Sequence, residues 1–276
     1  MRLDGMARTL PPAAPPPAPL LDAVRLRPGV HVVRRDAEHL QVGLDAPGRV
    51  IVRGDGPVAA LLDDLTQGRA PHRPDERGRR LLSRLADAGL LVGPDDDDPA
   101  PRGTVELVDR GLDLGPLRPL LAASGIACAV DGTPPALRVV ASSAPLPRAV
   151  VDPWMRDGVP HLVLAGTGGP GSLRLGPLVA PGRSACLRCV DAHEAVLDPR
   201  RPLIVEQLAD RPAVPPSPAL LALALAWTAR EVHAHLTGER ATTWSATLDL
   251  HDGVPELRRW ERHPHCGCAW HELGYR

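Results

Sequence analysis

Two closely spaced pairs of cysteines constrain the fold of this chain more than any other feature. Cys186 and Cys189 are two residues apart, Cys266 and Cys268 are one residue apart, and 76 residues separate the two pairs. Zn²⁺ prefers a tetrahedron of sulfur ligands, and a closely spaced pair offers two sulfurs to one ion. The spacing therefore predicts one structural zinc ion. Because four thiolates fill the coordination sphere, the metal is not expected to be catalytic.

Two other interpretations of these cysteines are a disulfide framework and a redox pair. Thiols stay reduced in the cytosol, and redox pairs of this spacing usually begin a helix after a strand. Residues 181–183, Pro-Gly-Arg, instead indicate a loop before Cys186. Cys128 lies in an apolar stretch and is expected in the core. Four sulfurs leave His263 and His265 without a ligand role.

Charge and composition exclude several classes of protein. The chain of 276 residues has 32 basic and 33 acidic residues, a formal net charge of −1, so nothing favours nucleic acid or an anionic membrane as a partner. No apolar run reaches the roughly 18 residues of a membrane span. The N-terminus lacks a secretory signal, so we expect a cytoplasmic protein. The chain has neither Lys nor Asn, which excludes a Schiff base and a phosphate-binding lysine.

The order of patterns along the chain predicts an α/β protein with two domains. Residues 1–21, rich in Pro and Ala, favour disordered, extended chain. Residues 22–94 run as three strands, two helices and a small strand, which is typical of a winged-helix-like domain. Residues 95–102 are expected to be an acidic linker, although the four aspartates 95–98 could also form a metal site. Residues 103–276 alternate strands and helices, which predicts a mostly parallel sheet with helices on both faces.

The expected elements follow from hydrophobic periodicity and from turn residues. The expected strands are 31–35, 39–44, 49–53, 90–92, 104–108, 126–130, 137–141, 161–165, 173–179, 243–250 and 256–259. The expected helices begin at Asp55 or Gly56 and after Pro74, and cover 117–123, 148–157 and 219–236. The glycine-rich residues 166–171 join two strands, so they predict a hairpin turn and not a phosphate-binding loop.

Residues 175–189 (LGPLVAPGRSACLRC), Asp191-Ala-His193 and residues 263–268 (HPHCGC) resemble the ThiF-like family. This family is related to the ubiquitin-activating enzymes and to adenylyltransferases of thiamine and molybdopterin biosynthesis. The branch most similar is the actinobacterial one associated with ribosomal peptide modification. Residues 26–43 resemble the PqqD-like, leader-peptide-binding region that precedes the ThiF-like domain in partners of azoline-forming cyclodehydratases. The resemblance covers Leu26 to the C-terminus and implies a Rossmann-type domain, a zinc knuckle and a homodimer.

Departures from the family pattern affect the expected activity. Active members adenylate a carboxylate with a Gly-rich loop, Arg, Asn and Lys contacts to the triphosphate, and an Asp that holds Mg²⁺. At the loop position this chain has residues 109–115 (DRGLDLG), and at the position of the metal-binding Asp it has Ser142-Ser143. Adenylyl chemistry depends on positioning and charge stabilisation. The departures imply a ThiF-like scaffold without adenylation activity, so ATP and Mg²⁺ are not expected as cofactors.

The resemblance and its departures together imply a non-catalytic recognition protein. It would bind the leader of a precursor peptide and present it to a partner enzyme such as a YcaO-type cyclodehydratase. The expected peptide contacts are Val50 and Val52 on the third strand and Arg79, Arg80 and Arg84 on the second helix. These arginines suit an acidic leader, but a solvated helix face would carry them too.

Two alternatives belong to other functional classes. The first is an adenylyltransferase that activates a peptide or carrier-protein carboxylate through an arginine-based ATP site. The second is a DNA-binding regulator built on the winged helix, against which the near-neutral charge counts.

Overall fold

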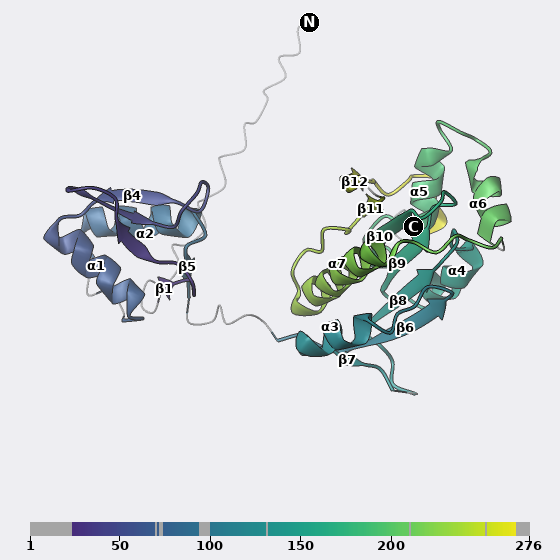
Figure 1. Cartoon of the computed structure of the whole chain (residues 1–276), viewed down its shortest axis with the longest axis horizontal. Helices are drawn as coiled ribbons and strands as arrows, with labels where there is room; N and C mark the ends of the chain where they lie inside the picture. The colour runs from purple at the N-terminus through teal and green to yellow at the C-terminus, as the bar shows by residue number, and fades with distance from the viewer. Residues whose placement is uncertain are drawn as a thin grey trace, which may run out of the picture. The chain divides into compact units, whose positions relative to one another are not determined.

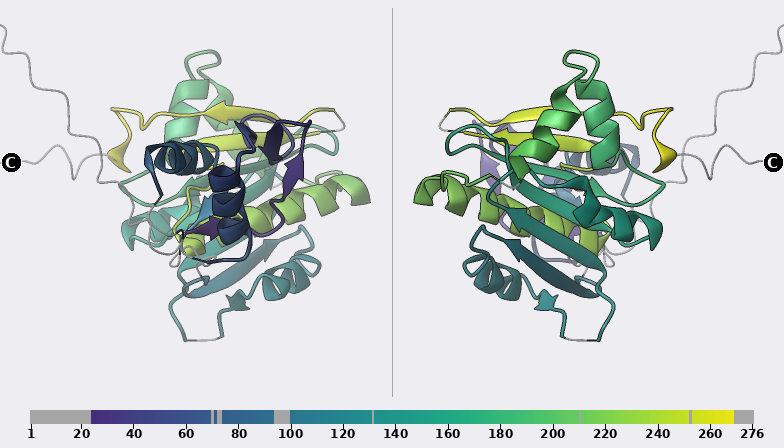
Figure 2. Two further views of the ribbon diagram at one scale, coloured as in Figure 1. Left: turned by 90° about the vertical axis from the view of Figure 1, so that its left-hand side faces the viewer. Right: turned by 90° about the vertical axis from the view of Figure 1, so that its right-hand side faces the viewer.

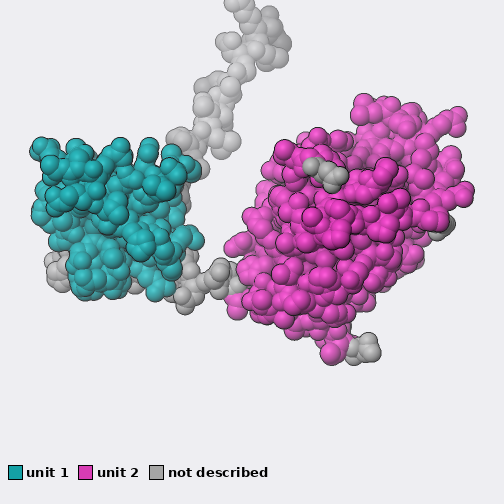
Figure 3. Space-filling view, in the orientation of Figure 1, with its two compact units in different colours: residues 1–98 teal, residues 99–276 magenta. Residues whose placement is uncertain are grey.

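The computed structural model describes residues 24–69, 71, 74–93, 100–130, 132–209, 211–251 and 253–268. The chain divides between Asp98 and Pro99 into two compact units, which we call unit 1 and unit 2 (Figure 3). The Pro/Ala-rich residues 1–21 and the four aspartates 95–98 lie outside the described residues.

Unit 1 combines a small antiparallel sheet with two helices (Figure 1). Its elements are β1 (Arg25–Leu26), β2 (Val32–Arg34), β3 (His39–Val42), β4 (Val50–Arg53), α1 (Gly56–Thr66), α2 (Glu76–Asp87) and β5 (Leu91–Val92). The sheet has the order β2-β3-β4, and β1 pairs separately with β5. The sequence did not predict β1. Within unit 1, β2 and β4 are therefore the two edge strands of the sheet.

Local sequence sets both helix starts of unit 1, and leucines hold the helices together. The carboxylate of Asp55 accepts a hydrogen bond from Val58 N–H at 3.2 Å, and that of Asp75 accepts one from Gly78 N–H at 2.7 Å. These are N-caps, which satisfy amides that a helix leaves without partners. Leucines spaced three and four residues apart face the core, namely Leu61, Leu62 and Leu65 of α1 and Leu81, Leu82 and Leu85 of α2.

Unit 2 is built on a seven-stranded sheet of order β12-β11-β10-β9-β8-β6-β7. Its strands are β6 (Thr104–Arg110), β7 (Ala127–Cys128), β8 (Leu137–Ser142), β9 (His161–Gly166), β10 (Leu173–Val179), β11 (Ala246–Leu250) and β12 (Glu256–Arg259). Its helices are α3 (Leu117–Ala123), α4 (Arg148–Arg156), α5 (Leu187–Glu194), α6 (Arg201–Ala209) and α7 (Pro218–Thr237). Among the described residues, no helix combines the length and the apolar character needed to cross a membrane.

The sheet of unit 2 is mixed, which corrects the prediction of a mostly parallel sheet. Strands β7, β6, β8 and β9 run parallel, whereas β10, β11 and β12 each run antiparallel to their neighbours. A parallel neighbour requires a long crossover, and an antiparallel one requires only a turn. Residues 167–172 supply such a turn, since Leu173 pairs with Gly166. The predicted hairpin turn at the glycine-rich segment is therefore confirmed, and it is also the place where the sheet changes direction.

Helices cover both faces of this sheet (Figure 2). On one face α3 and α7 pack against Val139, Leu162 and Leu164. On the other, α4 and the start of α5 pack against Val140 and Val163. Neighbouring residues of a strand thus belong to different cores, as expected from side chains that alternate between the faces of a sheet.

Candidate functional sites

The four paired cysteines meet at one point of unit 2. Cys186 is the N-cap of α5 and Cys189 lies in its first turn, while Cys266 and Cys268 follow β12. The four Sγ atoms lie within 4.8 Å of one another. The Sγ–Sγ distances are 3.7 Å for Cys186–Cys189, 3.6 Å for Cys186–Cys266 and 3.4 Å for Cys189–Cys268. Sulfurs 2.3 Å from a tetrahedral zinc ion would be about 3.8 Å apart. The cluster could therefore hold a metal ion.

The surroundings of the cluster also suit a cation. Three of the cysteines are buried and Cys268 is half-buried. Burial, together with hydrogen bonding to Cys189, raises the pKa of the Cys268 thiol to about 12. Hydrogen bonds with Cys189 and Cys266 raise the pKa of Cys186, while bonds from Cys186 and Cys266 lower that of Cys189. Protein groups alone thus favour a mixture of thiols and thiolate. A divalent ion supplies the positive charge that lets all four ionise.

The setting of Cys186 corrects one sequence argument. Residues 181–183 form the expected turn, but Cys186 then begins α5, which follows β10. This is the helix-start setting that is usual for a redox pair. The second pair is what separates this cluster from such a pair, because Cys266 and Cys268 supply two further sulfurs at 3.6 Å and 3.4 Å.

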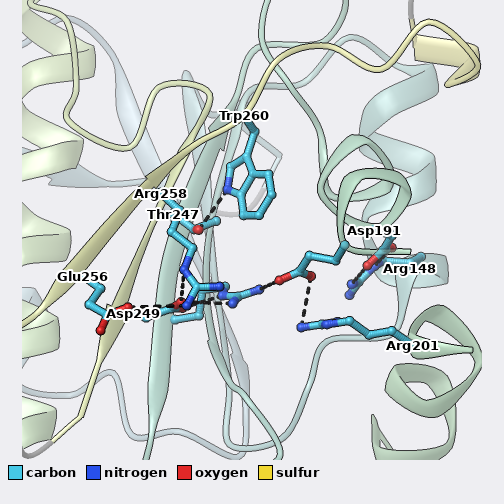
Figure 4. A network of polar contacts seen from close by, with 10 residues as sticks. Arg148, Asp191, Arg201, Thr247, Asp249, Glu256, Arg258 and Trp260 are labelled. Carbon is cyan, nitrogen blue, oxygen red and sulfur yellow. Dashed lines mark hydrogen bonds and ion pairs between the residues drawn. The ribbon is translucent and has the colours of Figure 1, made fainter. Parts of the chain in front are cut away.

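Buried ion pairs anchor α5, the helix that carries the first cysteine pair (Figure 4). Arg148 of α4 donates to both carboxylate oxygens of Asp191, at 2.6 Å and 2.5 Å. Arg174 of β10 bridges Glu194 at 3.0 Å and Asp249 of β11 at 2.5 Å. Burial lowers the pKa of Arg174, but the two carboxylates outweigh burial and raise it. The position of α5 is therefore coupled to β10 and β11.

The residues of this network were not predicted from the sequence to have a role. Asp191 entered only as part of the resemblance, and Arg148, Arg174 and Glu194 were not considered. A usable signal was the spacing of Asp191 and Glu194, three residues apart and thus on one face of a helix. That signal required α5 itself, which the sequence analysis did not predict.

A cavity of about 710 Å³ lies beside the cysteine cluster, with Cys186, Cys266 and His161 among its lining residues. His161 is fully buried, and its Nδ1 bonds to the Val159 carbonyl at 3.0 Å. Burial lowers the pKa of His161 to about 4, so the ring is neutral at neutral pH. Its Nε2 has no hydrogen-bond partner among the described residues.

The residues predicted to contact a peptide fall into different positions around β4. Val50 is buried at 3% exposure and belongs to the core of unit 1. A groove of about 460 Å³ lies between β4 and α2, and is lined by His39, Ile51, Val52, Arg53, Arg77, Arg80, Leu81 and Arg84. Val52, Arg80 and Arg84 thus meet at this groove. Arg79 is not among its lining residues and donates to the Pro74 carbonyl at 2.9 Å. Arg53 and Arg77 also line the groove, although the sequence did not predict them as peptide contacts.

Strand register identifies the backbone groups at the free edge of β4. Gly54 N–H donates to the Glu38 carbonyl at 2.8 Å, and β3 and β4 pair as His39–Arg53, Leu40–Val52 and Gln41–Ile51. Hydrogen-bonded pairs alternate along an antiparallel ladder. Val52 therefore bonds to β3, whereas the amides and carbonyls of Ile51 and Arg53 face outward. The Ile51 carbonyl accepts a hydrogen bond from Arg84 at 3.0 Å.

The loop after β6 lies where open α/β sheets usually bind nucleotides. Strand β6 has β7 on one side and β8 on the other, so their carboxyl ends form a switch point. A cavity of about 580 Å³ there is lined by residues that include Asp109, Arg110, Ser142, Ser143 and Arg211.

Two amides of this loop already have partners. Gly111 N–H donates to Asp109 at 2.7 Å, and Gly115 N–H donates to Asp113 at 2.8 Å. Leu112 and Leu114 are buried in the core. Carboxylates thus occupy amides that could otherwise face a phosphate.

Comparison with known proteins shows a shared fold. No protein-family model and no curated protein matches the chain. A heterocyclase solved in complex with substrate and cofactor covers 90% of this chain at 17% identity and a TM-score of 0.63. The heterocyclase TruD covers 90% at 19% identity and a TM-score of 0.64. MccB of E. coli, solved with ATP, covers 90% at 12% identity and a TM-score of 0.62. The chain spans 39% and 43% of the two heterocyclases and 99% of MccB.

We expect one tightly bound metal ion per chain. Cys266→Ser should lower the metal content well below one per chain and reduce Tm by several degrees, because folding and metal binding are coupled. Elemental analysis and thermal unfolding measure the two effects. Cys128→Ser is the matched control, since this half-buried cysteine of β7 lies outside the cluster. Metal-free protein from a chelator-free preparation would contradict the assignment.

Proposed function

We propose that this protein is a ThiF-like recognition protein in the biosynthesis of ribosomally synthesised peptides that carry azoline or azole rings. It binds the leader of a precursor peptide through unit 1 and presents the precursor to a YcaO-type cyclodehydratase. The observation that carries the proposal is the outward-facing edge of β4 beside a groove. The fold shared with two heterocyclases agrees with a place in such chemistry.

An extended peptide can bind here by adding a strand to the sheet. Strand addition requires unpaired amides and carbonyls along an edge, with a neighbouring surface for side chains. Ile51 and Arg53 provide the backbone groups, and Val52 and Leu81 provide an apolar floor. Unit 1 thereby acts as the PqqD-like, winged-helix-like peptide clamp that the sequence predicts.

The cysteine cluster serves this function as a structural zinc site. Four sulfurs leave no open position for water or substrate. The ion joins the segment after β12 to α5, and α5 is held by Arg148 through Asp191. Zinc thus stabilises unit 2 as a scaffold and takes no part in chemistry.

The ThiF-like half carries no adenylation activity in this proposal. Asp109 and Asp113 bring negative charge to the loop where a triphosphate would bind, and Ser142 ends the strand where the family places its Mg²⁺-binding Asp. The alternative function, an adenylyltransferase, would use the cavity at the same point, which Arg110 and Arg211 line.

Isothermal titration with Mg-ATP separates these two functions. We expect no binding with a Kd below about 1 mM, because Asp109 and Asp113 repel phosphate and already accept hydrogen bonds from two amides of the loop. Micromolar binding that is lost in Arg110→Ala would establish the adenylyltransferase instead. The control is Arg118→Ala, because Arg118 is an exposed residue of α3 that does not line the cavity.

A homodimer formed through unit 2 is also part of the proposal. The outward face of α7 carries the exposed residues Ala219, Ala222, Leu223 and Ala226, an apolar stripe of the kind that interfaces cover. We expect light scattering at tens of micromolar to give twice the chain mass of 29.3 kDa. Leu223→Glu should yield monomers, whereas Val196→Glu, at an exposed site outside α7, should not. A monomeric wild-type protein would exclude this interface.

Peptide binding can be tested at the edge of β4. A phage library of random twelve-residue peptides is selected on the full chain, and enriched peptides are titrated by fluorescence anisotropy. We expect Ile51→Pro to weaken binding at least tenfold, since it removes an outward amide without breaking the ladder. Val52→Pro is unsuitable, because it removes a bond to Leu40 within the sheet.

The matched control for this experiment lies on the opposite edge. Arg35 N–H donates to the His39 carbonyl, so the Arg34–Leu40 pair is not hydrogen-bonded and the Arg34 amide faces away from β3. Arg34→Pro should leave the affinity unchanged. Equal losses in both variants, or no enriched peptide, would show that the β4 edge is not a peptide site.

A further inference from the structure

We propose that the groove between β4 and α2 is specific for an acidic peptide segment, and that Arg84 binds its carboxylate. This inference rests on the proposed function, because it names the class of peptide that the same groove takes. It goes beyond that function by assigning the specificity to one residue and to an exchange of its hydrogen bond.

The groove concentrates positive charge. Arg53 of β4 and Arg77, Arg80 and Arg84 of α2 line it. The three helix residues follow one another at intervals of three and four, so they lie along one face of α2. Among the described residues, those that line the groove include no Asp or Glu. An acidic segment is therefore the complementary partner for this groove.

Arg84 differs from the other three arginines in its partners. Arg53 pairs with Glu38 at 3.2 Å, Arg77 pairs with Asp55, and Arg80 pairs with Glu76. Arg84 donates to the Ile51 carbonyl and has no carboxylate partner among the described residues. Of the four groove arginines, it is the one whose charge no carboxylate of the described residues compensates.

The bond that Arg84 makes is one that an added strand must replace. The Ile51 carbonyl faces the free edge of β4, and an incoming peptide amide would bond to it. Arg84 then loses its acceptor while its guanidinium stays beside the new strand. A peptide carboxylate restores a partner, and a charge-assisted bond is stronger than the neutral one that was lost. A peptide that has no carboxylate within reach of Arg84 breaks the bond between Arg84 and the Ile51 carbonyl and supplies no new partner for the guanidinium.

The geometry also gives the spacing of the acids. Side chains of an added strand point alternately to its two sides, so residues two apart are about 6.8 Å apart on the same side. Arg80 and Arg84 are four residues apart on α2, a rise of about 6 Å. Two acids at alternate positions of the peptide therefore match Arg84 and Arg80, whose pair with Glu76 is exposed and easily exchanged.

The test uses the peptides selected from the random library on the full chain. We expect them to carry Asp or Glu at alternating positions. Each is resynthesised with Asn or Gln in place of the acids, and both forms are titrated against wild type, Arg84→Gln and Arg79→Gln. The acidic form should lose about tenfold in affinity with Arg84→Gln and less than twofold with Arg79→Gln. The neutral form should bind wild type and Arg84→Gln alike.

Three outcomes would overturn the inference. Neutral peptides that bind in an Ile51-dependent manner would leave the proposed function standing and remove the acidic specificity. If Arg84→Gln and Arg79→Gln lowered the affinity for the acidic peptide equally, the arginines would act only through the general positive charge of the surface. If Ile51→Pro instead lowers the mass of the peptide-free protein in light scattering, the edge pairs with a second copy of the chain.

Discussion

Four sulfur atoms packed within 4.8 Å form the constraint on which unit 2 depends. Thiolates at this separation repel one another, and a divalent ion bound among them would turn that repulsion into a cross-link between the segment after β12 and the start of α5. The cross-link is useful only if α5 is itself fixed. Asp191 and Glu194 fix it through Arg148 and Arg174, and Arg174 continues to Asp249 on β11. The cysteine cluster, α5 and the antiparallel strands thus form one connected assembly.

A second constraint acts in unit 1, where the backbone groups at the edge of β4 need partners. A free strand edge is prone to pair with another chain. Arg84 covers one carbonyl of this edge, and three exposed ion pairs surround the groove. In the proposed complex, Arg84 would exchange this bond for a carboxylate of the peptide that adds to the edge.

The switch point of unit 2 shows how a few side chains alter a common fold. The cavity at the carboxyl ends of β6 and β8 is present. The loop that borders it directs Leu112 and Leu114 into the core and bonds two of its amides to Asp109 and Asp113. A solved neighbour of the same fold contains ATP. Fold likeness alone therefore does not assign ATP chemistry to this chain.

The sequence by itself determined the cysteine pairs, most strands, the helix starts at Asp55 and Asp75, and the hairpin at residues 166–171. These depend on local spacing, caps and turn residues. Only the tertiary structure decided the mixed sheet, the helix that begins at Cys186, the network of Arg148 and Arg174, and the outward position of Ile51 rather than Val52. Each of these depends on which strand lies beside which and in what register. A shift of one residue in the pairing of β3 and β4 would turn the backbone groups of Val52 outward and those of Ile51 into the sheet. Hydrophobic periodicity carries no information on that choice.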